Sequence, residues 1–185
     1  MAFRHTAVVG FGSNLGHPAA LLTSAWKALA DIPGVHPWKI SSPYLSQPVA
    51  MDSPHWFVNA VGLLQTTHAP LDLLHILQSI ETGFGRVRDP GSVGYQDRVL
   101  DLDLLLYDDL VLDTPELTIP HPRMRERRFV VDPLVEVAES ISLAPFEVPV
   151  EVWAQGWRQA VKGQKVERCA WLDLTNELVD GAATG

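Results

Sequence analysis

The chain contains a single cysteine, Cys169. One cysteine excludes an intramolecular disulfide, a CxxC redox pair and a thiolate metal cluster, and it suits a reducing compartment. Long apolar runs are missing too, because no stretch approaches the ~18 apolar residues of a membrane span. The amino terminus lacks the basic segment, apolar region and cleavage site of a signal peptide. We therefore expect a cytoplasmic protein with no membrane partner.

Positive charge is also scarce, since 14 Lys and Arg face 22 Asp and Glu, for a net charge of −8. Holding nucleic acid by bulk electrostatics needs a basic surface, so we expect no nucleic-acid partner and only a local phosphate site. There is no GxxxxGK[ST] motif, and Gly10 to Leu15 lacks the third glycine of a dinucleotide fingerprint. HExxH, GxSxG and the protein-kinase motifs are absent as well.

What is present is an apolar pattern sufficient for one domain, because 46% of the 185 residues are hydrophobic. Apolar spacing and Pro/Gly punctuation predict the following elements: strands over 6–11, 39–45, 56–65 and 100–107, and helices over 18–32, 70–84, 126–131 and 152–161. The order strand, helix, strand, strand, helix, strand predicts an α+β, ferredoxin-like sandwich. We expect a mainly antiparallel sheet with helices on one face.

The strongest chemical signal is Asp101-Leu102-Asp103 at the start of an apolar strand. Side chains of a strand alternate, so the two carboxylates share one face, and Leu102, Leu104 and Leu106 are expected on the other. Carboxylates so placed suit Mg²⁺, with water and substrate phosphates completing its coordination. The alternative is a strand end whose acids point into water, but acids on a central strand are costly unless they are paired or bind metal.

Arginines gather around this pair. Seven of the ten lie between Arg86 and Arg128, a stretch without lysine. The planar guanidinium suits bidentate contacts with phosphate, so the segment is typical of a polyphosphate site. Nine acids share the stretch, however, and solvated surface pairs are the alternative.

The ordered motifs of the chain resemble the 6-hydroxymethyl-7,8-dihydropterin pyrophosphokinases of folate biosynthesis. The resemblance rests on these segments: GFGSNLG at 10–16, SSPYLSQPV at 41–49, FVNAV at 57–61, LQSIETGFGRVR at 77–88, DRVLDLDLLLYDD at 97–109 and LTIPHPRMRERRFVVDPLVEVA at 117–138. We expect a pterin pyrophosphokinase domain over 1–165, a carboxyl-terminal extension over 166–185 whose tail is flexible, and a monomer. The resemblance implies transfer of pyrophosphate from ATP to the pterin, giving AMP.

The resemblance implies a role for each site residue. Asp101 and Asp103 would ligate two Mg²⁺ ions, and Arg86 and Arg98 would act in the chemical step. The expected ATP-binding residues are Gln78, Glu81, Arg88, Tyr95, Leu104, Thr118, His121 and Arg127. The expected pterin-binding residues are Ser46, Val49, Phe57, Asn59 and Phe129, with the two rings sandwiching the pterin.

The chain departs from the family pattern at the nucleotide loop. The loop between Arg88 and Arg98 is about two residues longer, Tyr95 stands where the family has tryptophan, and Glu116 stands where some members have arginine. Pro and Gly in 87–97 predict a lid that closes over the triphosphate. Two other functions remain open from the residues: a non-catalytic binding module with the same fold, and a different Mg²⁺-dependent nucleotidyl- or phosphotransferase.

Overall fold

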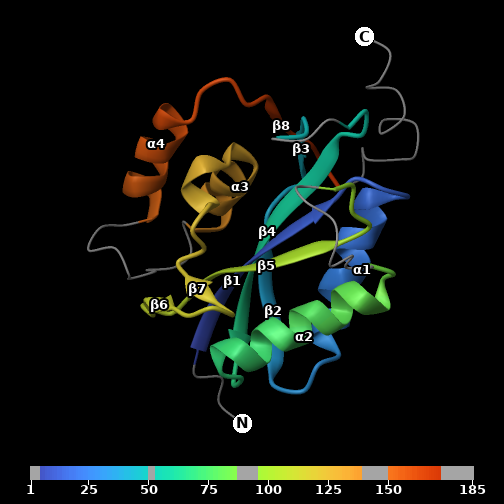
Figure 1. Ribbon diagram of the computed structural model, residues 1–185, viewed down its shortest axis with the longest axis vertical. Helices are drawn as coiled ribbons and strands as arrows, with labels where there is room; N and C mark the ends of the chain where they lie inside the picture. Colours follow the sequence, from blue (N-terminus) through green and yellow to red (C-terminus); the bar gives the residue numbers. More distant parts are fainter. Residues whose placement is uncertain (1–4, 50–52, 87–95, 139–149, 172–185) are drawn as a thin grey trace.

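The computed structural model describes residues 5–49, 53–86, 96–138 and 150–171 (Figure 1). Its elements are β1 (His5–Ser13), α1 (Pro18–Ala30), β2 (Val35–Ile40), β3 (Tyr44–Ser46), β4 (Phe57–Thr66), α2 (Pro70–Gly83), β5 (Asp101–Tyr107), β6 (Leu112–Asp113), β7 (Thr118–Ile119), the 3₁₀ turn η1 (Met124–Glu126), α3 (Arg128–Ala138), α4 (Val150–Ala160) and β8 (Val166–Arg168). The expected lid, 87–97, lies almost wholly outside the described residues. None of the helices in the described part combines the length and hydrophobicity needed to cross a membrane.

One antiparallel sheet organises the chain. Its strands run in the order β5-β1-β4-β3-β8, and β2 also pairs with β4; β6 and β7 form a separate two-stranded sheet. The described order β1-α1-β2-β3-β4-α2-β5 follows the predicted alternation and confirms the α+β, ferredoxin-like class. Among the described strands of this sheet, only the neighbours β3 and β4 follow one another in the chain, so most of the pairing joins segments distant in sequence.

Helices cover both faces of the sheet, so the expectation of helices on one face is wrong. On β1, Ala7, Val9 and Phe11 pack in one core with residues of α1 and α2. Val8 points the other way and packs with residues of α3. Figure 1 shows α1 and α2 on one side of the sheet, with α3 on the opposite side. The period-2 alternation of β1 thus divides two apolar layers.

A β-bulge changes the face assignment in β5. Val8 pairs with Leu106 but Val9 pairs with Leu104, so Leu105 is an extra residue on β5. Leu102 and Leu104 consequently face the α1/α2 core, while Leu105 and Leu106 face the α3 core. The expectation that Leu106 shares a face with Leu102 is therefore wrong, because a bulge resets the alternation.

The strand expected over 39–45 is two strands, β2 and β3, which pair with successive parts of β4. Between them the Ser41 amide donates to the Val61 carbonyl, and the Val61 amide donates to the Ser41 side chain at 3.0 Å. Pro43 follows and has no amide to donate. A side chain therefore replaces one backbone acceptor, and the regular ladder stops there.

The helix expected over 126–131 is longer than predicted, because α3 runs from Arg128 to Ala138 with Pro133 inside it. Pro133 is the sixth residue of α3, so its missing amide removes one hydrogen bond within the helix, to the Phe129 carbonyl. The buried apolar residues of α3 lie against β4, which explains why the helix continues past the proline.

Candidate active site

A cavity of about 300 Å³ opens on the α3 side of the sheet. Its lining is Gly10, Phe11, Gly12, Ser46, Gln47, Val49, Phe57, Asn59, Ala60, Arg98, Asp101, Asp103, Leu105, Arg123, Glu126, Arg127, Phe129 and Val130. The lining comes from β1, β3, β4 and β5, from the loops after β3 and before β5, and from the stretch that runs into the first turn of α3. It combines apolar rings at one part with acids and arginines at another.

The register of the sheet explains how these groups meet. Tyr44 pairs with Asn59, Asn59 with Gly12, and Gly12 with Asp101, which makes one row across four strands. Directly paired residues of antiparallel strands point to the same face. Asn59 and Asp101 therefore face the same cavity although 42 positions separate them in the sequence (101 − 59).

Glycines form the floor between these two side chains. A Cβ added at Gly12 would stand 3.4 Å from Asn59 Oδ1 and 3.8 Å from the Cβ of Asp101. One added at Gly10 would stand 3.4 Å from a methyl carbon of Leu105. The absence of side chains here keeps open the space that joins the two parts of the cavity.

Asp101 is clamped by arginines in the described structure. Its Oδ1 accepts a hydrogen bond from Arg86 Nη1 at 2.5 Å, and its Oδ2 accepts one from Arg98 Nη1. Arg86 also pairs with Glu81, which is buried and accepts from the Leu102 amide at 2.7 Å. Glu81 thus anchors Arg86 to the start of β5.

Asp103 has a different environment from Asp101. Its charge partner is Arg127 at 3.8 Å, a distance at which the interaction is weak. Burial and the neighbouring charge of Asp101 raise the pKa of Asp103 to about 6, against the lowering effect of Arg127 and Arg98. The charge of Asp101 disfavours the ionised form of Asp103, and a bound cation would relieve this cost.

Arg98 is positioned by Asn14. The Asn14 amide donates to the Arg98 carbonyl at 3.0 Å, and the Arg98 amide donates to Asn14 Oδ1 at 2.7 Å. Asn14 Nδ2 donates to Asp97, which also accepts from Ser53 Oγ at 2.6 Å. The turn after β1 therefore fixes the backbone from which Arg98 reaches Asp101.

The ring-lined part of the cavity has its own ordered polar group. Asn59 is buried, and its Nδ2 donates to Ser46 Oγ at 2.9 Å and to the Tyr44 carbonyl at 3.4 Å. Phe129 carries the Arg127 guanidinium over its ring at 5.6 Å. An amide, a hydroxyl and two aromatic rings can recognise a flat ligand with a polar edge.

His121 lies next to this site, on the segment after β7. Its own amide donates to the Leu105 carbonyl, and its Nδ1 accepts from the Arg123 amide at 3.2 Å. Burial and the charges of Arg127 and Arg123 lower the pKa of His121 to about 4. A neutral ring that accepts at Nδ1 carries its proton on Nε2, which leaves a donor for an anionic ligand.

The cavity unites both expected metal ligands, all five expected pterin residues, Arg98 and Arg127. The other described ATP candidates lie outside its lining: Gln78 and the buried Glu81 on α2, the buried Leu104 on β5, Thr118 on β7, and His121. Arg88 and Tyr95 lie outside the described residues. The sequence analysis assigned no individual role to Arg123, Glu126, Gly10 or Gly12, which also line the cavity. The two glycines at alternate positions of one strand, in Gly10-Phe11-Gly12, could have indicated an open space on one face of the sheet.

The donor set fits magnesium bound together with a substrate. Within the described ranges, no group of three or more His, Cys, Asp or Glu converges to hold a metal ion. Magnesium is usually held by one or two carboxylates, with phosphates and water completing the octahedron. Asp101 and Asp103 supply two carboxylates at the cavity wall, and the nearby arginines suit the phosphates.

Comparison with known sequences points to one family. The family model described as 7,8-dihydro-6-hydroxymethylpterin-pyrophosphokinase (HPPK) matches residues 8–139. A 2-amino-4-hydroxy-6-hydroxymethyldihydropteridine pyrophosphokinase of Haemophilus influenzae is 39% identical over 150 residues, covering 81% of this chain and 92% of the relative. The Pseudomonas aeruginosa protein of the same name is 41% identical over 135 residues, covering 73% and 82%.

Solved structures share the fold. An HPPK-DHPS in complex with substrates superposes with a TM-score of 0.64 at 13% identity, covering 86% of this chain. Plasmodium falciparum HPPK-DHPS gives a TM-score of 0.62 at 12% identity, covering 83%. The chain spans 44% and 43% of the lengths of these two proteins.

Proposed function

We propose that this chain, which belongs to the 7,8-dihydro-6-hydroxymethylpterin-pyrophosphokinase family, transfers pyrophosphate from ATP to 6-hydroxymethyl-7,8-dihydropterin. The products are AMP and the pterin diphosphate, on the route to folate. The protein is an ATP-dependent diphosphotransferase. Its cytoplasmic location and monomeric state stay predictions from the sequence.

One observation carries the proposal beyond family membership. A single cavity contains the Asp101/Asp103 pair, Arg98 and, across the glycine floor, Asn59 with two phenylalanine rings. Acids and arginines suit a metal-bound polyphosphate, and rings with an amide suit a pterin. A transferase needs both ligands in one cavity, whereas a binding module needs only one of them.

We assign the ring-lined part to the pterin. Phe57 and Phe129 would stack on its two faces, while Asn59, Ser46 and the backbone up to Val49 would read its polar edge. Asn59 is held by Ser46 and Tyr44, so its orientation is set before the ligand enters. A preorganised amide loses little freedom on binding.

We assign the acid and arginine part to the triphosphate. Asp101 and Asp103 would hold two Mg²⁺ ions, and bound Mg²⁺ would neutralise phosphate charge and orient the transferred group. Arg86 and Arg98 would turn from Asp101 toward phosphate oxygens, while His121 donates from Nε2 and Arg127 pairs with phosphate. Arg88, Tyr95, Gln78, Glu81, Leu104 and Thr118 stay proposed contacts on the nucleotide side.

In the transfer, the hydroxymethyl oxygen forms a bond to the β-phosphorus of ATP. The bond between that phosphorus and the oxygen bridging to the α-phosphorus breaks, and AMP leaves with the bridging oxygen. The hydroxyl proton passes to water. Phosphoryl-type transition states are loose in most analyses, so arginines that position and neutralise matter more than a strong base.

The test is product identity. Purified protein with ATP, Mg²⁺ and the reduced hydroxymethyl pterin should release AMP and pterin diphosphate in equal amounts. Asp103→Asn should abolish most of this release, while Asp109→Asn, at an exposed acid outside the cavity lining, should not. Release of ADP instead would indicate a simple kinase, and folded protein that forms neither nucleotide would favour a binding module.

A further inference from the structure

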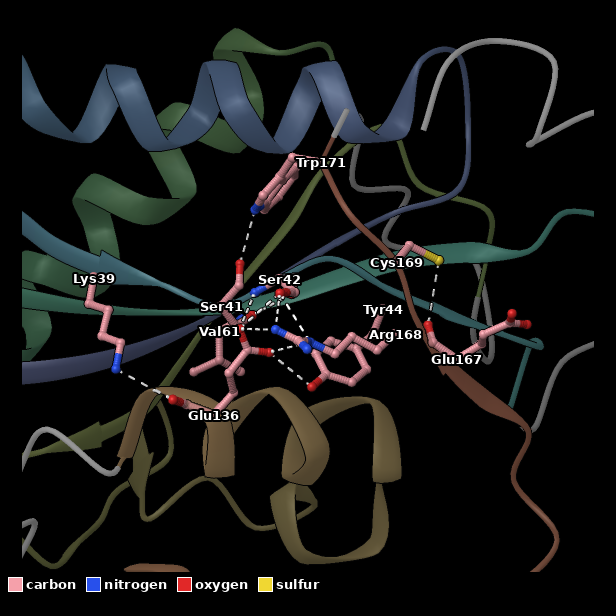
Figure 2. A network of polar contacts seen from close by, with 10 residues as sticks. All are labelled: Lys39, Ser41, Ser42, Tyr44, Val61, Glu136, Glu167, Arg168, Cys169 and Trp171. Carbon is pink, nitrogen blue, oxygen red and sulfur yellow. Dashed lines mark hydrogen bonds and ion pairs between the residues drawn. The ribbon is translucent and has the colours of Figure 1, made fainter. Parts of the chain in front are cut away.

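A polar network centred on Glu136 joins α3 to the sheet beside the cavity (Figure 2). Glu136 Oε1 accepts from the Ser42 amide and the Ser42 hydroxyl, both at 2.9 Å. Its Oε2 accepts from the Tyr44 hydroxyl at 2.9 Å and from Arg168 Nε at 3.2 Å. Arg168 also donates to Ser42 Oγ at 2.9 Å. One carboxylate therefore ties α3, the entry to β3 and β8 together.

The segment 165–171 completes this arrangement from the outer edge of the sheet. Strand β8 pairs with β3 over its whole length, with Arg168 opposite Tyr44 and Val166 opposite Ser46. Beyond the strand pair, the Cys169 amide donates to the Pro43 carbonyl at 2.9 Å, and Trp171 Nε1 donates to the Ser41 carbonyl at 3.1 Å. The stretch from Ser41 to Ser46 is thus held on both sides, by β4 and by 165–171.

Strand β3 needs that support because it is three residues long. A strand this short, paired on one side, would open locally at little cost. Burial raises the pKa of Tyr44 first, and the hydrogen bond to Glu136 raises it further, so the phenol remains a donor. Partial burial would raise the pKa of Glu136, but its bonds from Ser42, Tyr44 and Arg168 hold that pKa below the ordinary value. The acceptor is therefore ionised at neutral pH.

Strand β3 orients the side-chain amide of Asn59, which lies in the ring-lined part of the cavity. Tyr44 stands directly opposite Asn59, and the Tyr44 carbonyl and Ser46 hydroxyl both accept from Asn59 Nδ2. The cross-strand row through Asn59 and Asp101 begins at Arg168 on β8. A shift of β3 along or away from β4 would move both acceptors of Asn59 without touching Asp101.

We propose that Glu136 and Arg168, with strand β8, are positioning residues for the pterin subsite, because they hold β3 at the place where Asn59 is oriented. The assignment of this subsite to the pterin rests on the proposed function. None of these groups touches the substrate; they act through Tyr44, Ser46 and Asn59. The carboxyl-terminal segment is on this view part of the support of the active site.

The experiment uses two matched arginines in the full-length chain. Arg168 and Arg158 both come from the carboxyl-terminal part, and both pair with an acid of α3, Glu136 and Asp132 respectively. Their side chains are 62% and 41% exposed. Arg168→Ala removes the hydrogen bonds that link β8 to Glu136 and Ser42, next to β3. Arg158→Ala removes a contact between α3 and α4 instead.

Arg168→Ala should raise the KM for 6-hydroxymethyl-7,8-dihydropterin by about threefold, since an exposed pair contributes little. Glu136→Ala should raise it by about tenfold or more, because the hydroxyl of the buried Tyr44 and both donors of Ser42 lose their acceptor. Glu136→Gln should recover part of that loss. The KM for ATP and kcat should be the same in Arg168→Ala and Arg158→Ala, and Arg158→Ala should keep the wild-type KM for the pterin. The thermal unfolding midpoint of Arg158→Ala should fall at least as far as that of Arg168→Ala, because its partner Asp132 is buried.

Hydrogen exchange of the 44–46 amides supplies a readout that does not depend on turnover. Exchange should be faster in Arg168→Ala than in Arg158→Ala. The proposal is overturned if the two variants exchange alike, if the KM for ATP rises as much as that for the pterin, or if the pterin KM stays unchanged in Glu136→Ala. Wild-type protein that forms no AMP would instead overturn the proposed function, and the exchange comparison would still test whether Arg168 holds β3.

Discussion

The two aspartates of the cavity should have opposite effects on stability when each is neutralised. Asp101 has two arginine partners, so Asp101→Asn removes the negative charge that both guanidinium groups face. The ionised form of Asp103 is unfavourable in the folded protein, because burial and the charge of Asp101 raise its pKa to about 6. We expect Asp101→Asn to destabilise the fold and Asp103→Asn to stabilise it, while both variants lose most turnover.

The structure sets the size of each effect. The pKa of Asp103 moves from 3.8 to about 6, and each unit corresponds to ~1.36 kcal/mol. The Asp103 side chain is 37% exposed, so solvent screening reduces the ~3 kcal/mol total to about 1–2 kcal/mol. Asp101 is 17% exposed, and loss of one partner from a mostly buried pair costs about 2–4 kcal/mol here.

The pH dependence has a definite sign. Because the folded pKa of Asp103 lies above the unfolded one, the folded state binds the proton more tightly. Stability therefore falls as the pH rises from about 4 to about 6 and then stays low. The gain from Asp103→Asn should accordingly be small near pH 4 and complete above about pH 6.

Urea denaturation of wild type, Asp101→Asn and Asp103→Asn in EDTA at pH 4.5 and pH 8 would measure these differences, with AMP release measured separately in Mg²⁺. Asp109→Asn serves as the control for loss of an exposed acid. Equal destabilisation by both cavity variants, or a gain for Asp103→Asn that is larger at pH 4.5 than at pH 8, would refute the reasoning.

Three further predictions follow from the same geometry. Phe57→Ala and Phe129→Ala should each weaken pterin binding by about 1 kcal/mol or more and leave ATP-analogue binding nearly unchanged; calorimetric titration showing equal losses would indicate a core role instead. His121 should titrate in NMR with a pKa of about 4, so its stability contribution is lost as the pH falls from about 6.5 to about 4; Arg127→Ala should raise that pKa, and a wild-type value near 6 would contradict the assignment. Glu81→Ala should lower the free energy of unfolding by about 2–4 kcal/mol, because the buried Leu102 amide loses its acceptor and Arg86 loses one of its two carboxylate partners; a loss below about 0.5 kcal/mol in urea denaturation would show that Glu81 is not an anchor.

Local patterns in the amino-acid sequence determine much of this protein by themselves. Period-2 and helical spacing predicted the alternation of strands and helices, because one-sided burial imposes a period on each element. The Asp101-Leu102-Asp103 spacing put both acids on one face, and the two acids do line one cavity. The ordered motifs identified the family, which the comparisons confirm.

Tertiary structure decided what depends on contacts distant in sequence. The bulge that turns Leu106 away from Leu102 arises from the pairing of β5 with β1, and no local pattern encodes that register. Placement of α3 on the face opposite α1 and α2 follows from which side of β4 remained apolar and uncovered. The anchoring of Arg86 by Glu81 and the pairing of β8 with β3 likewise join segments that only the folded chain brings together. Sequence spacing defines which side chains share a face, and packing between faces determines which of them meet.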